Sequence, residues 1–271
     1  MNTTESSIRF FERRGQGLRE FAEATGYALS LLLGGLARLG QAKRRAATVI
    51  EQMANGSVRV LHVVLLVGCF SGMILSLQTG LELARWSQQD LIGTIVSLAM
   101  VREMGPFITA TILAATTGSA LAAELATMSV SEELLALEVL SMETTAFLVM
   151  PRVVALAVIA PLLTIFVDAI GIAGGSLVAR FQLDVSFATF YDRAFESLRE
   201  TAVHLPVPKD LYVGLFKAVV FGLTIAAIAC AAGMRARGGA KGVGDATRRS
   251  VRNAVILIIV FNYYITSLFY R

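Results

Sequence analysis

The stretch from Val153 to Ala179 decides the fold, and it reads VVALAVIAPLLTIFVDAIGIAGGSLVA. Among its 27 residues only Asp168 carries a charge. A helix of this length rises about 40 Å, which is enough to cross a hydrocarbon core of about 30 Å. The apolar residues are continuous and do not alternate with polar ones, so the pattern indicates a membrane-spanning helix and excludes a strand of an outer-membrane barrel.

The rest of the chain repeats this pattern. The 271 residues are 55% hydrophobic and 16% charged, with a mean hydropathy of +0.67, far from the roughly 25% charged residues of a soluble domain. We therefore predict an all-α, polytopic integral membrane protein with N-terminal residues 1–59 and a five-helix part, 60–271. The predicted spans are about 60–83, 91–117, 148–179, 210–233 and 251–270.

The N-terminal part contains one more apolar segment, Tyr27–Leu39, which is too short to cross a bilayer. Nearby aromatic and aliphatic residues lie among basic ones, as is typical of a helix in the membrane interface; a frayed tail is the alternative. These residues are Phe10, Phe11, Leu18 and Phe21. The early arginines, Arg9, Arg13, Arg14 and Arg19, adjoin no apolar core with a cleavage site, so we expect no removable signal peptide.

The distribution of lysine and arginine predicts the orientation. Residues 1–59 hold nine and 234–252 hold six, whereas the three connections on the opposite side together hold six. Because cytoplasmic loops are enriched in these residues, fifteen against six favours a cytoplasmic N-terminus and a C-terminus on the outer side.

Two connections should contain helices of their own. The loop after the second span has no basic residue between Arg102 and Arg152. It carries instead five acidic residues, Glu124, Glu132, Glu133, Glu138 and Glu143. We expect Ser131 to cap a short amphipathic helix containing the leucines Leu134, Leu135, Leu137 and Leu140. On the outer side, apolar residues recur at helical spacing after Ser186, which predicts an amphipathic helix over about 186–200.

Charges inside the spans require a partner or a function, because each costs at least a few kcal/mol to insert. Arg102 and Glu103 precede Pro106 in the second span, and we expect each to find partners on other helices, in water or in a lipid headgroup. The alternatives are a lipid cavity and a purely structural salt-bridge network. At similar depth, Asp168 and Lys217 are predicted to form a structural charge pair.

Several other functions find no support in the sequence. The glycine-rich stretch 237–245 lacks the spacing of a phosphate loop, so we expect no nucleotide site. The two cysteines and two histidines have no metal-ligand spacing, and no catalytic set is visible; they are Cys69, Cys230, His62 and His204. A net charge of +4 is explained by topology, so no nucleic acid is expected as a partner.

Several motifs, taken together and in order, resemble the MlaE/YrbE family of ABC transporter permeases. The four strongest are GMILSLQ (72–78), VREMGP (101–106), GSALAAEL (118–125) and EELLALEVL (132–140). Further matches occur at 151–152, 161–164, 171–178, 217–222 and 242–248. The similarity extends from about residue 30 to the end of the chain.

The resemblance implies a homodimer in the bacterial inner membrane that carries phospholipid, with cytoplasmic ATPase subunits that bind ATP and magnesium, and periplasmic MCE-domain proteins. No cofactor is implied for this chain. The region 124–143 would be the coupling helix that docks the ATPase, through Glu124, Glu132, Glu133, Leu134, Leu137 and Glu138. The family's lipid pocket points to Leu75, Leu77 and Gln78 near Arg102 and Glu103. One departure is Thr116-Thr117, where the family commonly has Gly-Arg, so a basic contact is missing.

Three functions are compared. The first is a permease that moves phospholipid between the membrane and an MCE partner. The alternatives are an intramembrane lipid-modifying enzyme, for which no convincing catalytic set exists, and a membrane scaffold for an MCE protein, which would not need Arg102 and Glu103.

Overall fold

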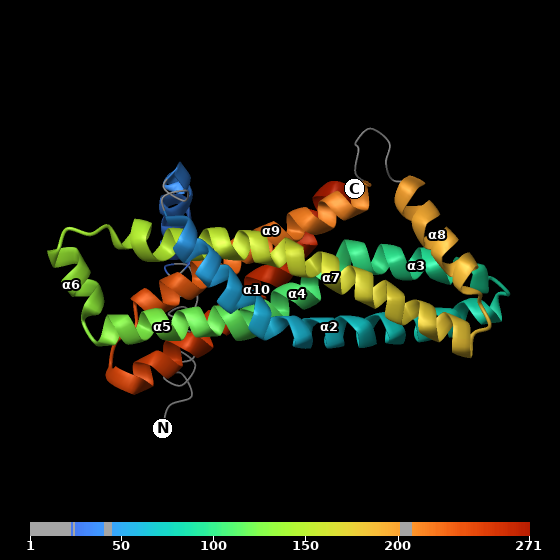
Figure 1. Ribbon diagram of the computed structural model, residues 1–271, viewed down its shortest axis with the longest axis horizontal. Coiled ribbons are helices and arrows are strands. Elements are labelled where there is room, and N and C mark those ends of the chain that lie inside the picture. Colours follow the sequence, from blue (N-terminus) through green and yellow to red (C-terminus); the bar gives the residue numbers. More distant parts are fainter. Residues whose placement is uncertain (1–22, 24, 41–44, 201–207) are drawn as a thin grey trace, which may run out of the picture.

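The computed structural model describes residues 23, 25–40, 45–200 and 208–271, and the regular structure in this part of the chain is helical. Five helical segments are long and apolar enough to cross a membrane, which confirms the five predicted spans. They are Val60–Arg85, Gln89–Val130, Thr145–Gln182, Lys209–Met234 and Gly239–Tyr270. Figure 1 shows the long helices packed side by side in an elongated bundle.

The first span belongs to a longer helix, α2 (Ala46–Arg85), of 40 residues. At about 1.5 Å per residue it extends for about 60 Å, roughly twice the thickness of a hydrocarbon core. The division that we placed between residues 59 and 60 falls inside this continuous helix.

The second span is a stack of short helical segments. In chain order they are η2 (Gln89–Leu91), α3 (Ile92–Ala99), η3 (Met100–Met104), α4 (Gly105–Leu113), η4 (Ala114–Gly118) and α5 (Ser119–Val130). Both η3 and η4 are π-helical turns, in which the helix widens by one residue. The first of them directly precedes Gly105 and Pro106, where the ring of proline removes a backbone donor. The second span is therefore irregular just before Pro106, in the form of a π-turn.

The remaining elements alternate between connections and spans. They are α6 (Glu133–Val139), η5 (Thr145–Val149) leading into α7 (Met150–Gln182), α8 (Phe187–Glu200), α9 (Lys209–Met234) and α10 (Gly239–Tyr270). Ser186 accepts a hydrogen bond from the backbone of Thr189, 3.1 Å, and α8 begins where predicted. Ser131 does not cap α6. Its hydroxyl donates to the Thr127 carbonyl, 2.9 Å, because α5 continues to Val130.

Small residues hold α2 against α7. Gly72 lies directly on the backbone of Gly171, so a side chain at Gly72 would collide with α7, whereas one at Gly171 would first meet the Met100 side chain. One turn further on, the Ser76 hydroxyl donates to the Gly175 carbonyl, 2.8 Å. The small residues of α2 and α7 therefore let the two helices pack closely within the chain. Of the five spans, α9 is the most buried, with 72% of its 18-residue apolar stretch inside the protein. The corresponding share for α10 is only 17%.

The connections gather at two opposite ends of the bundle, with α6 at one end and α8 at the other (Figure 1). A helix over Thr25–Ala37, too short to span, packs on η5 and the start of α7, where Gly34 lies against Thr145 and Gly35 against Met150. The salt bridge between Arg38 and Glu143, 2.7 Å, joins its end to the connection after α6. The Arg235 guanidinium lies over the ring of Tyr27, 5.6 Å, and brings the α9–α10 turn to the same end. The basic and aromatic residues before position 22 lie outside the described residues.

Candidate functional site

The charged residues of the second span point towards α9 and α10. From the π-turn η3, the Arg102 guanidinium donates two hydrogen bonds to the carboxylate of Asp210, at 2.7 and 2.9 Å. The Tyr270 hydroxyl donates to the same carboxylate, 2.6 Å, and its ring lies 4.9 Å from the guanidinium. Asp210 is fully buried, whereas the Arg102 side chain is 33% exposed. A two-pronged pair of this kind fixes the guanidinium plane.

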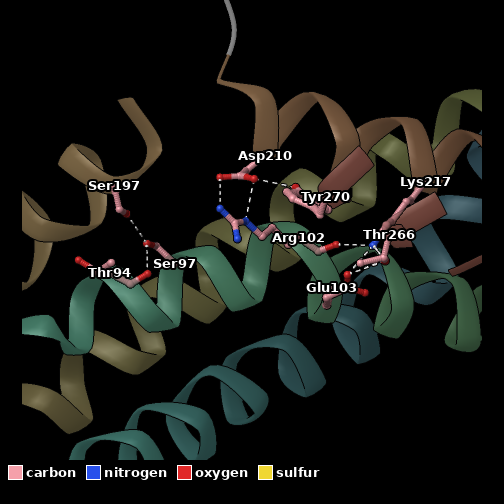
Figure 2. Close-up of polar contacts among 9 residues, drawn as sticks. All are labelled: Thr94, Ser97, Arg102, Glu103, Ser197, Asp210, Lys217, Thr266 and Tyr270. Carbon is pink, nitrogen blue, oxygen red and sulfur yellow. Dashed lines mark hydrogen bonds and ion pairs between the residues drawn. The ribbon is translucent and has the colours of Figure 1, made fainter. Parts of the chain in front are cut away.

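Glu103 has a separate set of partners, of which Figure 2 shows Lys217 and Thr266. Its carboxylate receives hydrogen bonds from Lys217 Nζ, 2.7 Å, from Thr266, 2.8 Å, and from the Asn262 amide, 2.8 Å. Lys217 also donates to the backbone carbonyl of Arg102, 2.9 Å. Pro106 lies four residues after Arg102 and has no N–H to occupy that carbonyl, so the lysine fills its place. Of the partners expected for Arg102 and Glu103, which were other helices, water or a lipid headgroup, the structure shows those on other helices.

The charge pair predicted between Asp168 and Lys217 is wrong. Lys217 is fully buried and bound to Glu103. The Asp168 carboxylate lies over Gly105 of α4, and its Oδ1 atom has no hydrogen-bond partner. The two residues were matched by depth in the bilayer alone, but the direction in which each helix presents its side chain decides the partner.

The residues predicted on α2 lie away from these contacts. Leu75 and Leu77 are half-buried against the core of the bundle, and Gln78 is exposed. α2 packs chiefly on α7, whereas the ion pairs of Arg102 and Glu103 are made with α9. Arg102 and Glu103 thus belong to one polar network, and the three predicted α2 residues lie outside it. The other members of the network are Asp210, Lys217, Asn262, Thr266 and Tyr270.

A short helix, α6, lies within the region 124–143 where the coupling helix was predicted, but its exposed apolar residues differ from those expected. Leu134 is buried in the chain's own core and Leu137 is half-buried against it. The side chains that α6 and its end expose are Leu135, Val139 and Leu140, at 56%, 77% and 70%. In a helix with many leucines, the sequence does not show which face packs against the rest of the chain. The prediction therefore assigned ATPase docking to Leu134 and Leu137, which face the chain's own core.

The acidic residues of this region have different surroundings. Glu124 belongs to α5, where its carboxylate accepts a hydrogen bond from Arg152, 2.7 Å. Glu132 adopts a left-handed backbone conformation before α6, and Glu133 accepts a hydrogen bond from Ser131, 2.9 Å. Glu138 is exposed. The four carboxylates therefore do not form one cluster with shared contacts in the described residues.

Three members of the network, Asp210, Asn262 and Thr266, have only a faint signal in the sequence. Asp210 stands at the very edge of the fourth predicted span, and Asn262 and Thr266 are polar residues within the fifth. Each lies more than a hundred residues from its partner in the second span, so no local pattern relates them. At Thr116-Thr117 the sequence departs from the family pattern. Here the Thr117 hydroxyl donates a hydrogen bond to the Gly56 carbonyl, 3.1 Å, and joins the second span to α2.

The described residues contain no group of three or more histidine, cysteine or acidic side chains able to hold a metal ion. What the geometry offers is a helical, five-span membrane protein whose interior holds two ion pairs on a π-turn, each with one partly exposed member. This arrangement is typical of membrane transport proteins, where intramembrane charges mark a substrate path.

Comparison with known proteins agrees with this class. The pattern of the permease MlaE family matches residues 49–268, and the chain belongs to that family of ABC transporter permeases. A probable ABC transporter permease protein of Rickettsia conorii is 35% identical over 257 residues, 95% of this chain and 96% of that protein. The intermembrane phospholipid transport system permease protein MlaE of Haemophilus influenzae is 31% identical over 263 residues, 97% and 98% of the two chains.

A plant relative is also similar. The chloroplastic protein TRIGALACTOSYLDIACYLGLYCEROL 1 of Arabidopsis thaliana is 32% identical over 234 residues, which cover 86% of this chain and 65% of that protein.

Proposed function

We propose that this chain is the permease subunit that moves phospholipid between the bacterial inner membrane and a periplasmic MCE-domain partner, energised by ATP hydrolysis in a separate subunit. The Haemophilus influenzae relative is named as the permease of an intermembrane phospholipid transport system, which supports the substrate class. The observation that carries the proposal is the polar network on η3, because its ion pairs combine a fully buried member with a partly exposed one.

That asymmetry suits an exchange of partners. Arg102 and Glu103 are 33% and 31% exposed, whereas Asp210 and Lys217 are fully buried. A lipid phosphate that reaches the guanidinium competes with Asp210 for the same donors, and charge-assisted hydrogen bonds of this kind are strong. When the lipid leaves, Asp210 takes the donors back. In the lipid-bound state Asp210 keeps only the Tyr270 hydroxyl, and a buried carboxylate without its counter-charge favours the return of the guanidinium, which allows release as well as binding.

Two surfaces suit the protein partners. We assign the exposed side chains of Leu135, Val139 and Leu140 on α6 to the contact with the ATPase, which places this end in the cytoplasm. The poorly buried α10 suits a homodimer contact, because it exposes a broad apolar stripe. Its members are Ile256, Ile259, Val260, Tyr263, Tyr264 and Leu268. With five spans, the C-terminus then lies in the periplasm.

Lipid transfer by the reconstituted transporter tests the proposal. Arg102→Lys and Glu103→Asp, which keep the charges that the buried Asp210 and Lys217 need but change the hydrogen-bond geometry, should depress transfer while the yield of the assembled complex stays near normal. If both variants transfer lipid at the full rate, the role assigned to the network is wrong. Mass spectrometry of the lipid after transfer separates the permease from a lipid-modifying enzyme, because the permease leaves the lipid chemically unchanged.

A further inference from the structure

A cleft of about 510 Å³ lies between α2 and the η4–α5 part of the second span, apart from the polar network. Its volume is within the range of small-molecule sites. The lining changes in character along the helices, from carboxylate and amide groups through hydroxyls to aliphatic side chains. The residues that show this are Glu51, Gln52, Thr116, Thr117, Glu124 and Val60.

The polar end of the cleft lies at the boundary of the membrane-spanning region. On α2, Glu51 and Gln52 precede Val60, where the apolar span begins. The second span runs antiparallel to α2, so Glu124, beyond Thr117 in α5, comes to the same end. A cleft that is polar at this boundary and apolar deeper in matches an amphiphile whose headgroup stays at the membrane surface.

An exposed apolar stripe continues from the cleft along α2. Val63 lines the cleft, and Leu66, Phe70 and Ile74 follow it at spacings of three, four and four residues, which place them on one helix face. They are exposed by 39%, 60%, 55% and 55%. From the first to the last the helix rises about 16 Å, roughly half of a 30 Å hydrocarbon core. The stripe therefore has the length of one acyl chain in one leaflet.

The charge of the cleft selects the headgroup. Glu124 is held by Arg152, whose guanidinium is 95% buried and donates a second hydrogen bond to the Leu148 carbonyl, 2.7 Å. The Glu124 side chain itself remains 50% exposed. Glu51 adds a second, exposed carboxylate. Carboxylates only accept hydrogen bonds, and an ammonium group donates three. The amide of Gln52 offers donors that suit a phosphate.

We propose that this cleft binds the ammonium-bearing headgroup of a zwitterionic phospholipid from the leaflet on the α6 side, with an acyl chain along the α2 stripe. The inference rests on the proposed function for its substrate class, phospholipid, and adds a second binding place and a headgroup preference. A lipid seated here lies on the other side of the second span's helical stack from the contacts that Arg102 and Glu103 make with α9 and α10.

Photolabelling of the assembled transporter tests the site. The complex is placed in vesicles of equal phosphatidylethanolamine and phosphatidylglycerol, with a trace of either lipid carrying a diazirine in its acyl chain. We expect the ethanolamine lipid to label residues 63–74 about fivefold more than the glycerol lipid. This factor corresponds to about 1 kcal/mol, the contribution of one exposed ion pair between the lipid ammonium and a carboxylate of the cleft. Glu51→Gln should remove this preference. Ala120→Phe, which fills the cleft, should remove the labelling, whereas Ala115→Phe, at an exposed position outside the lining, should not.

The outcomes separate the two levels of the proposal. Equal labelling by both lipids overturns the headgroup assignment. If Ala120→Phe does not reduce the labelling of residues 63–74 in a complex that still transfers lipid, the assignment of the cleft as a lipid site is wrong. The proposed function is then unaffected. A correctly assembled complex that transfers no lipid refutes the proposed function, whatever its labelling pattern.

Discussion

Replacing Lys217 with methionine removes the most connected charge in the membrane interior. Its ammonium group is fully buried and donates to Glu103 and Thr266, both at 2.7 Å, and to the Arg102 carbonyl, 2.9 Å. Hydrogen bonds between helices in membranes average about 0.6 kcal/mol and reach about 1.7 kcal/mol, so three contribute roughly 2 to 3 kcal/mol. Glu103 also loses its counter-charge, but its 31% exposure limits that penalty. We expect a total loss of roughly 2 to 4 kcal/mol.

A double-mutant cycle measures the interaction itself. The variants are Lys217→Met, Glu103→Gln and their combination, and equilibrium unfolding in mixed micelles gives each free energy of unfolding. Glutamine keeps the shape of Glu103 and a carbonyl oxygen for Asn262, so it removes little more than the charge that faces Lys217. The coupling between Lys217 and Glu103 should therefore be about 1 to 2 kcal/mol. A second cycle, Lys217→Met with Asp168→Asn, should be additive within about 0.5 kcal/mol. Additivity in the first cycle together with coupling in the second would refute the arrangement.

The other predictions concern the end that carries α6. Val139→Asp should release the ATPase from a correctly inserted chain in a pull-down, whereas Leu134→Asp should lower the yield of folded chain, because Leu134 is buried. The purified chain alone should bind no ATP in equilibrium dialysis, since it has no phosphate loop. Arg38 holds the pKa of the Glu143 carboxyl below its usual 4.5, so their contact is complete above that pH and is lost as the pH falls through the lowered pKa. Hydrogen exchange in Thr25–Ala37, corrected for intrinsic rates, should rise on that acidification in the native chain and not in Glu143→Gln.

The spans could be predicted because hydropathy is a local property. Each apolar run of about twenty residues must form a helix in lipid, and all five predicted spans are present. The helix Phe187–Glu200 could be predicted equally well, because its apolar stripe and its start after Ser186 both depend on residues close together in the sequence. The end of the second span was less visible, because α5 continues to Val130 as a helix of mixed polarity.

The partners of the charged residues could not be predicted, because they depend on how distant helices are rotated about their axes. Depth alone paired Asp168 with Lys217, although α7 turns its carboxylate to Gly105 and α9 turns its ammonium to Glu103. Asp210 was missed for the same reason, since its partner is 108 residues away. What the sequence did show is that Arg102 and Glu103, being neighbours, must face different partners.

The π-turn at Met100–Met104 holds one residue more than an ordinary helical turn of about the same rise. Five residues of a π-turn and four residues of an α-helix complete about the same rotation, so the helices on both sides of η3 keep the facing that an unbroken helix would give them. Loss of one residue there would close the turn while α3 keeps its contact with α8. The change would be confined to the turn itself, where Arg102 and Glu103 would lose the directions in which they face Asp210 and Lys217. A single-residue deletion at this point therefore probes the two ion pairs alone, with the rest of the span as its internal control.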